Sequence, residues 1–170
     1  MLFVYMTLWF GISVVKKRND VADIAWGLGF VLITWISFAV SGSSSIFGIV
    51  IGILVTIWGV RLAWHIYARN KGKTEDYRYL AWRKEWGRWF YFRSYVQVYL
   101  LQGVLLYFIV FPVVLFNLHP GTTIFGFTEY VGVLIWGIGF FFESVGDAQL
   151  VAFMRDPRNK GAIMKSGLWR

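Results

Sequence analysis

The stretch VADIAWGLGFVLITWISFAV (21–40) decides the fold class, because its twenty residues include one ionisable side chain, Asp23. About twenty helical residues cross the roughly 30 Å hydrocarbon core of a bilayer. Lipid offers no partner to an open strand edge, so membrane-spanning segments of this kind are helical. Outward from this stretch, four further apolar segments follow the same pattern, the first of them short for a span: 2–15, 46–66, 95–116 and 130–154. The sequence therefore predicts an all-α transmembrane bundle of about five spans, forming a single membrane domain over residues 1–170.

The composition supports a membrane protein and excludes several other classes. Of the 170 residues, 58% are hydrophobic and 15% are charged, and the mean hydropathy is +0.57. Soluble domains carry about a quarter charged residues, so this chain lacks the side chains for a soluble surface and is too apolar for disorder. The absence of Cys excludes a thiolate site, and two His, one of them the outer-side His119, argue against a His-rich metal site. The GLG (27–29) and GIG (137–139) triplets lie inside spans, which argues against dinucleotide-binding loops.

The basic residues indicate the orientation of the spans. The net charge of +8 comes from 17 Lys and Arg against 9 Asp and Glu. Apart from Arg61, all the bases lie in residues 16–18, in the connector 67–94 or after Met154, whereas the connectors 41–45 and 117–127 have none. Cytoplasmic loops of membrane proteins are rich in Lys and Arg. The basic side is therefore predicted to be cytoplasmic, with the N-terminus outside. This placement of the basic residues indicates that they lie near membrane lipids and argues against nucleic acid as a partner.

Two clusters of ionisable residues lie at the ends of the second and third spans. Asp20 and Asp23 begin the second span, where Asn19 or Asp20 is the candidate helix cap and an acid in the first turn suits the helix dipole, which explains Asp20. Capping explains Asp23 less well, and a functional role for it stays open. Arg61, His65 and Arg69 are each four residues apart and form one stripe on the third span. Arg69 can reach the interface, whereas the deeper Arg61 needs an internal carboxylate or a bound phosphate.

The strongest signal for a site is the pair Glu143 and Asp147, four residues apart on the fifth span. Like charges at this spacing repel each other, and ionisable residues inside spans usually face the bundle interior. A helix keeps such a pair where bases, a ligand or a proton relay compensates it. The pair therefore predicts a functional polar pocket, with a structural salt bridge to Arg61 or to a tail base as the alternative.

The cytoplasmic connector carries a second pattern. Tyr79, Trp82, Trp86 and Trp89 follow a 3-4-3 spacing, which predicts an amphipathic helix resting in the headgroup layer. Membrane anchoring does not explain the segment EDYRY (75–79), where acids, a base and two phenols crowd together before that helix. Separately, glycines at helical spacing predict close helix packing at Gly48, Gly52, Gly132, Gly139 and Gly146.

Several segments, in order, carry a resemblance to a known family. They are NDVADIAWGLGF (19–30), RLAWHIYARNKGKTEDYRY (61–79), WRKEWG (82–87), LLQG (100–103), ESVGDAQLVAF (143–153) and NKGAIMKSGLWR (159–170). With these segments the chain resembles the bacterial steroid 5-alpha-reductase-like membrane family, DUF1295. The resemblance implies a cytoplasm-facing pocket in a helical bundle, NADPH as cofactor, and reduction of a carbon–carbon double bond in a steroid-like or other lipid substrate.

The resemblance also implies roles for individual residues. The catalytic candidates are Glu143, Asp23 and Tyr79, because an acid or a phenol can stabilise the negative charge that hydride addition leaves on an enone oxygen. The cofactor-binding candidates supply polar contacts and cations for phosphates. They are Asp147, Arg61, Arg155, Asn159, Lys160 and Arg170.

The sequence leaves two other functions open. One is a membrane methyltransferase for isoprenylated cysteine or phospholipid, since these enzymes have a similar bundle and use S-adenosylmethionine. The other is a non-enzymatic membrane protein, in which the acidic and basic side chains only form ion pairs with each other. In the resembled family, GLWR is followed by a box resembling Tyr-[Ser/Thr]-Arg-His-Pro-Asn-Tyr-Phe-Gly-Glu and by further helices. Because this chain ends at Arg170, it is expected to be a C-terminally truncated fragment that is inactive alone. The resemblance predicts location in a bacterial inner membrane.

Overall fold

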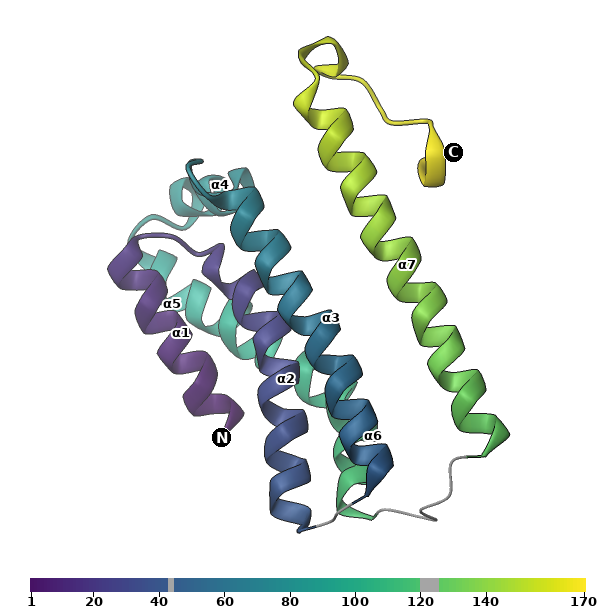
Figure 1. The fold of residues 1–170 in the computed structure, drawn as a ribbon. Helices are drawn as coiled ribbons and strands as arrows, with labels where there is room; N and C mark the ends of the chain where they lie inside the picture. Colours follow the sequence, from purple (N-terminus) through teal and green to yellow (C-terminus); the bar gives the residue numbers. More distant parts are fainter. Residues whose placement is uncertain (43–44, 120–125) are drawn as a thin grey trace. The chain divides into compact units, whose positions relative to one another are not determined.

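The computed structural model describes residues 1–42, 45–119 and 126–170, and every regular element in these ranges is helical (Figure 1). The all-α prediction is therefore confirmed. Short 3-10 turns follow α4 and α7 and end the chain, and a π-helical segment, Tyr95–Leu100, leads into α6. The α-helices are α1 (Leu2–Lys16), α2 (Val21–Ser41), α3 (Ile46–Asn70), α4 (Tyr77–Trp86), α5 (Phe90–Ser94), α6 (Leu101–Leu118) and α7 (Phe127–Arg155).

The predicted spans coincide with helices. Among the described residues, four helical stretches are long and apolar enough to cross a membrane, namely Val21–Ser41, Ile46–Asn70, Tyr77–Leu118 and Phe127–Arg155. The fifth apolar helix, α1, has 15 residues and is therefore about 22 Å long at 1.5 Å per residue. This set of helices is compatible with an integral membrane protein whose apolar faces contact membrane lipids. The orientation of the spans stays a prediction.

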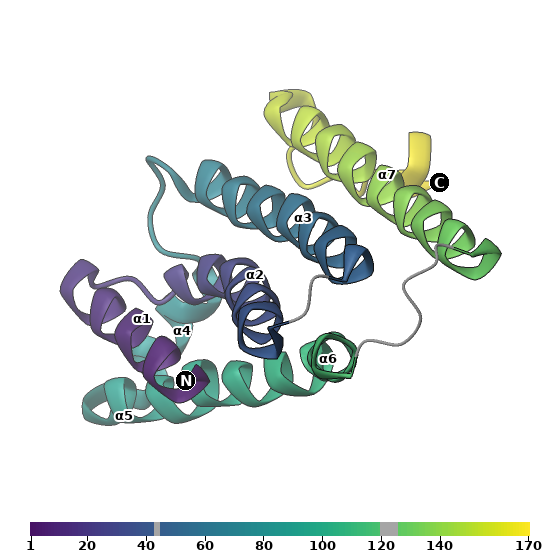
Figure 2. The same cartoon turned by 60° about the horizontal axis from the view of Figure 1, so that its bottom comes forward.

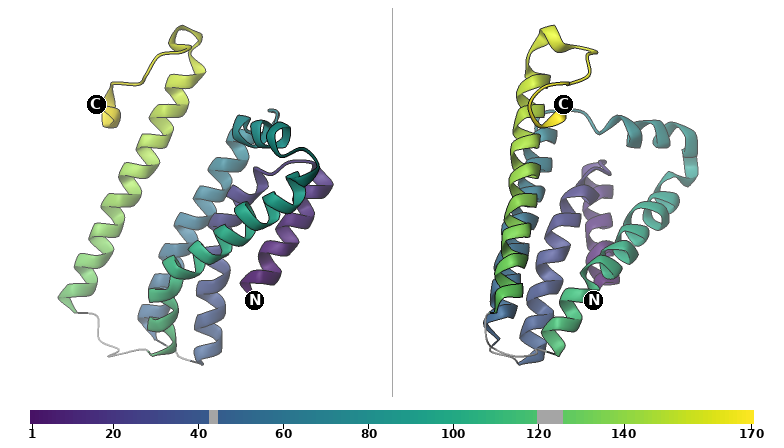
Figure 3. Two further views of the ribbon diagram at one scale, coloured as in Figure 1. Left: turned by 180° about the vertical axis from the view of Figure 1, so that it is seen from behind. Right: turned by 90° about the vertical axis from the view of Figure 1, so that its right-hand side faces the viewer.

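The chain divides into two compact units, Met1–Thr123 and Ile124–Arg170. In the first unit, α2 lies between α1 and α3 and also contacts α6 (Figure 2). The chain passes from α4 through the bend at α5 into α6, which runs back along α2 (Figure 3). This path brings the N-terminal end of α4 close to the N-terminal end of α2.

Glycine allows α2 and α3 to approach each other closely. A Cβ atom on Gly27 would lie 2.6 Å from the carbonyl oxygen of Gly59, and a Cβ atom on Gly59 would lie 2.6 Å from that of Gly27. The predicted packing role of Gly48 and Gly52 is confirmed, because added Cβ atoms there would meet the rings of Phe38 and Trp35 within 3 Å. The GLG triplet at 27–29 thus serves helix packing.

The predicted amphipathic helix is confirmed as α4, but most of its aromatic stripe faces the protein. Tyr79 and Trp86 are buried and Trp82 is half-buried. The rings of Trp82 and Trp86 stack with centroids 5.0 Å apart. The expectation that the stripe rests among lipid headgroups is therefore wrong for Tyr79 and Trp86, because other parts of the protein cover them: Tyr79 packs with Met6 and Ala22, and Trp86 packs against Trp82 and Phe90. Trp89, in the turn after α4, is 54% exposed.

Candidate active site

The N-terminal ends of α2 and α4 bring two polar motifs together. Asp23 lies in the first turn of α2, and Tyr79 lies in the first turn of α4. The hydroxyl of Tyr79 donates a hydrogen bond to Oδ1 of Asp23 at 3.2 Å. A guanidinium nitrogen of Arg78 lies 3.7 Å from Oδ2 of the same carboxylate. The site therefore combines a phenol and a carboxylate, which can share a proton, with a guanidinium that can stabilise the charged carboxylate.

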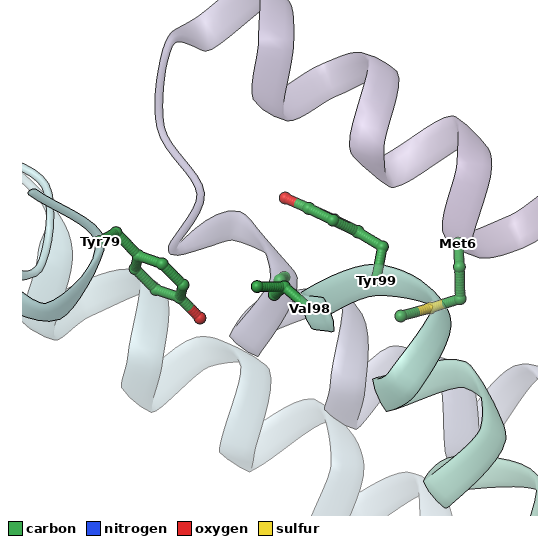
Figure 4. Close-up of a cluster of buried hydrophobic side chains, with 5 residues drawn as sticks. Met6, Tyr79, Val98 and Tyr99 are labelled. Atoms are coloured by element: carbon green, nitrogen blue, oxygen red, sulfur yellow. The ribbon is translucent and has the colours of Figure 1, made fainter. Parts of the chain in front are cut away.

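The Tyr79 ring borders an apolar cluster. Tyr79 is 4% exposed, and it belongs to a group of buried residues with Met6, Ala22, Val98 and Tyr99 (Figure 4). These residues come from α1, α2, α4 and the π-helical segment Tyr95–Leu100. The phenol thus has a largely apolar environment, in which its hydrogen bond to Asp23 is stronger than it would be in water.

Asp76 starts α4 and positions Arg78. Its carboxylate accepts hydrogen bonds from the backbone N–H of Arg78 at 3.0 Å and from the Arg78 side chain at 3.0 and 3.2 Å. These bonds stabilise the charged form, and the side-chain bond from Arg78 contributes most to holding the pKa of Asp76 below its usual value. Because Arg78 also approaches Asp23, it links the cap of α4 to the site.

The lowered pKa of Asp76 predicts a pH-dependent contribution to stability. Since the folded-state pKa lies below the unfolded value of about 3.9, the stabilisation is present above about pH 3.9 and is lost as the pH falls through the folded pKa. Asp76→Asn keeps a good N-cap but removes the charge. The variant is expected to unfold more easily by at most about 1 kcal/mol near neutral pH, because the pair is partly solvated. Melting curves of both proteins should converge in acid; a constant difference would contradict the argument.

A network of buried polar groups surrounds the start of α2. Asp20 stands at the N-cap position of α2, but its side chain does not cap the helix. Instead it pairs with Arg18 at 2.6 Å, and Arg18 also donates to the carbonyl of Lys73 at 2.8 Å. The capping explanation of Asp20 is therefore wrong, because the neighbouring guanidinium competes for the carboxylate. Asn19, which is 2% exposed, donates to Oγ of Ser94 at 2.9 Å.

The second unit contains the predicted acidic pair. Glu143 and Asp147 lie one turn apart on α7, as predicted, and both are half-buried. The chain after α7 folds back onto this helix: Trp169 donates from Nε1 to the carbonyl of Gly146, and Gln149 accepts the backbone N–H of Leu168, both at 2.9 Å. The folded-back tail thus covers Gly146, which is the buried residue of α7.

The predicted cofactor-binding residues at the end of α7 and beyond it differ in their surroundings. Arg155, Lys160 and Arg170 are exposed. Asn159 uses its side-chain amide to donate to the carbonyl of Phe153 at 2.9 Å, so it holds the turn that carries Lys160. Arg61 is half-buried on α3, in the other unit.

The structure brings Asp23 and Tyr79 together within the first unit, whereas Glu143 and Asp147 belong to the second unit. Glu75, whose carboxylate accepts the backbone N–H of Asn19 at 2.5 Å, is not among the predicted site residues, although it lies in the segment EDYRY (75–79), which membrane anchoring does not explain. In the part of the chain that the structure describes, no three His, Asp or Glu side chains are grouped so that they could hold a metal ion.

Comparison with known protein families shows a match over most of the chain. Residues 9–170 match the family described as "Protein of unknown function (DUF1295)". No curated protein and no solved structure matches the chain. The family description covers nearly the whole sequence and assigns no activity.

Proposed function

The chain belongs to the DUF1295 family, and on this premise we propose that it is a membrane-embedded, NADPH-dependent reductase of a carbon–carbon double bond in a steroid-like or other lipid substrate. The observation that carries the proposal is the 3.2 Å hydrogen bond between Tyr79 and Asp23. It supports a proton donor at the end of a predicted membrane span, where a lipid-like substrate can enter from the bilayer.

The chemistry needs a proton donor near the substrate oxygen. NADPH, when bound, supplies a hydride to the double bond of a conjugated ketone, and negative charge then develops on the ketone oxygen. In the proposed reaction Tyr79 turns its hydroxyl to that oxygen and donates the proton. Asp23, when protonated, donates in turn to the phenol oxygen and replaces its proton. Arg78, 3.7 Å away, stabilises the carboxylate that remains. The substrate thereby gains one hydride and one proton.

The residues of the second unit fit the chemistry of the cofactor. Phosphates bind to Arg and Lys side chains, and Arg155, Lys160 and Arg170 are exposed cations on or after the last turn of α7. The half-buried carboxylates Glu143 and Asp147 are acceptors for ribose hydroxyls or amide groups. Between them, Oγ of Ser144 is buried without a hydrogen-bond partner among the described residues, which suits a polar group of a ligand.

The proposal places the protein in a bacterial inner membrane with its N-terminus outside. Asp23 and Tyr79 then lie near the cytoplasmic surface, where NADPH is available. The exposed bases Lys17, Lys71 and Lys73 in the adjoining connectors support this orientation, since cytoplasmic loops are rich in Lys and Arg.

The test is ligand binding and turnover by the protein expressed from its complete reading frame and reconstituted in lipid nanodiscs. We expect saturable binding of NADPH, and oxidation of NADPH that depends on an added enone steroid. Retention of S-adenosylmethionine without NADPH binding would favour the methyltransferase. Binding of neither compound would favour a non-enzymatic membrane protein.

Matched variants test the phosphate site within the same experiment. Replacement of both Arg155 and Lys160 by Ala is expected to raise the Kd for NADPH at least about tenfold, since a hydrogen bond to a charged group contributes about 1.5–3 kcal/mol. Arg158→Ala is the control, because this base lies in the same segment but pairs with Asp156 at 2.6 Å. Equal effects of the double variant and of the control would contradict the assignment.

A further inference from the structure

Two hydrogen bonds join the N-terminal ends of α2 and α4 at matching positions. The backbone N–H of Asn19 donates to Oε1 of Glu75 at 2.5 Å, and the hydroxyl of Tyr79 donates to Oδ1 of Asp23 at 3.2 Å. Asn19 precedes Asp23 by four residues, and Glu75 precedes Tyr79 by four. Asn19 and Glu75 both lie in connecting segments, two residues before the first residue of α2 and of α4. A bond between them therefore joins the two segments that lead into these helices, next to the place where Tyr79 meets Asp23.

Arg83 holds the Glu75 side chain in place from a second direction. Its guanidinium donates to both oxygens of the Glu75 carboxylate at 3.1–3.2 Å and to the carbonyl of Lys17 at 3.3 Å. The same guanidinium lies 4.0 Å from the centre of the Phe90 ring. The Glu75 side chain is 5% exposed. A carboxylate this deeply buried and paired has little freedom to move, so it is a rigid link.

Asn19 extends this link to the helix that follows. Its side-chain amide donates to Oγ of Ser94 at 2.9 Å, and its carbonyl accepts the hydroxyl of Tyr99 at 3.4 Å. Ser94 and Tyr99 are fully buried. They lie at the end of α5 and in the π-helical segment Tyr95–Leu100, and π-helical turns frequently occur at functional sites. The Glu75–Asn19 bond thus connects the starts of α2 and α4 to the segment formed by α5 and the π-helical turn, whose residues Val98 and Tyr99 pack with Tyr79.

We propose that Glu75 is a positioning residue, which holds the Tyr79 hydroxyl against Asp23 by joining the starts of α2 and α4. This inference rests on the proposed function for its catalytic consequence, but the geometric claim stands by itself. Glu75 has no role as a proton donor here, because both of its oxygens accept hydrogen bonds from Asn19 and Arg83. Displacement of a reacting group by about 1 Å can lower a rate about a hundredfold.

The test combines turnover with fluorine NMR of a fluorotyrosine incorporated at position 79. Glu75→Ala is expected to shift or broaden this resonance and to lower kcat at least about tenfold, with a smaller change in KM. Glu75→Gln is expected to give an intermediate result, because its amide oxygen still accepts the Asn19 N–H while the ion pair with Arg83 is lost. Glu85→Ala is the matched control, since Glu85 is an exposed acid on α4, the helix that carries Tyr79, and neither readout should change.

The possible outcomes separate a positioning role from a purely structural one. A folded Glu75→Ala protein with the wild-type fluorine resonance and turnover, but a lower melting temperature, would overturn the proposal. If that variant does not fold, Arg83→Gln loosens the Glu75 carboxylate while leaving the Asn19 bond, and it should shift the same resonance; an unchanged resonance would again overturn it. If neither the unaltered protein nor any variant shows turnover, the proposed function fails. The fluorine resonance alone then shows whether Glu75 positions Tyr79.

Discussion

Tyr79→Phe is expected to lower the turnover of an enone substrate about a hundredfold or more, because a positioned general acid contributes about 10²–10⁴ to a rate. The variant keeps the ring that packs among Met6, Val98 and Tyr99 and removes only the hydroxyl. The free Asp23 carboxylate retains Arg78 nearby, so the fold should survive. Steady-state NADPH oxidation in nanodiscs measures the effect. The affinity for NADPH should change little, because the variant removes only a hydroxyl that is proposed to contact the substrate oxygen.

The matched control is Tyr77→Phe. Tyr77 lies two residues earlier on α4 and is 79% exposed, whereas Tyr79 is 4% exposed. Turnover of this control should equal that of the unaltered protein. Asp23→Asn should resemble Tyr79→Phe, since an amide cannot return a proton to the phenol. Full activity of both Tyr79→Phe and Asp23→Asn would remove the proton-donor role and leave the pair as a structural contact between α2 and α4.

The helices could be predicted from the sequence because the bilayer imposes a simple rule. Twenty apolar residues in a row have one stable structure in lipid, and stretches such as 21–40 and 46–66 therefore became α2 and α3. The pairing of Asp23 with Tyr79 could not be predicted from local pattern, because 56 residues separate them and no periodicity specifies how distant helices meet. The family resemblance named both residues, but not their contact.

Other features of the structure depend on tertiary packing, which the spacing of residues along the chain does not specify. The 3-4-3 stripe of α4 predicted the helix correctly, but an apolar face can pack on lipid or on protein, and Tyr79 and Trp86 pack on protein. Similarly, Asp20 matched the residue type of a helix cap, yet its carboxylate pairs with Arg18. The close approach of α2 and α3 involves Gly27 and Gly59, which lie on different helices and form no motif along the chain.

Gly27→Ala is expected to destabilise the first unit by about 1–3 kcal/mol, which is the usual cost of overpacking a tight contact. The added Cβ would lie 2.6 Å from the Gly59 carbonyl oxygen and 3.3 Å from the Ala63 nitrogen. Both are backbone atoms, so no side chain can rotate away, and α2 and α3 must separate. Gly59→Ala should have a similar effect, because its Cβ would meet the Gly27 carbonyl oxygen at 2.6 Å.

The control for these variants is Gly11→Ala, which is also within a helix but meets no atom within 4 Å. It should be neutral or slightly stabilising, because alanine favours the helix by about 0.5–1 kcal/mol over glycine. Thermal unfolding in detergent compares the three variants. Gly27→Ala should also lower turnover, since Asp23 lies one turn before Gly27 on α2 and moves with it. A melting temperature of Gly27→Ala equal to that of Gly11→Ala would show that the two helices do not meet at these glycines.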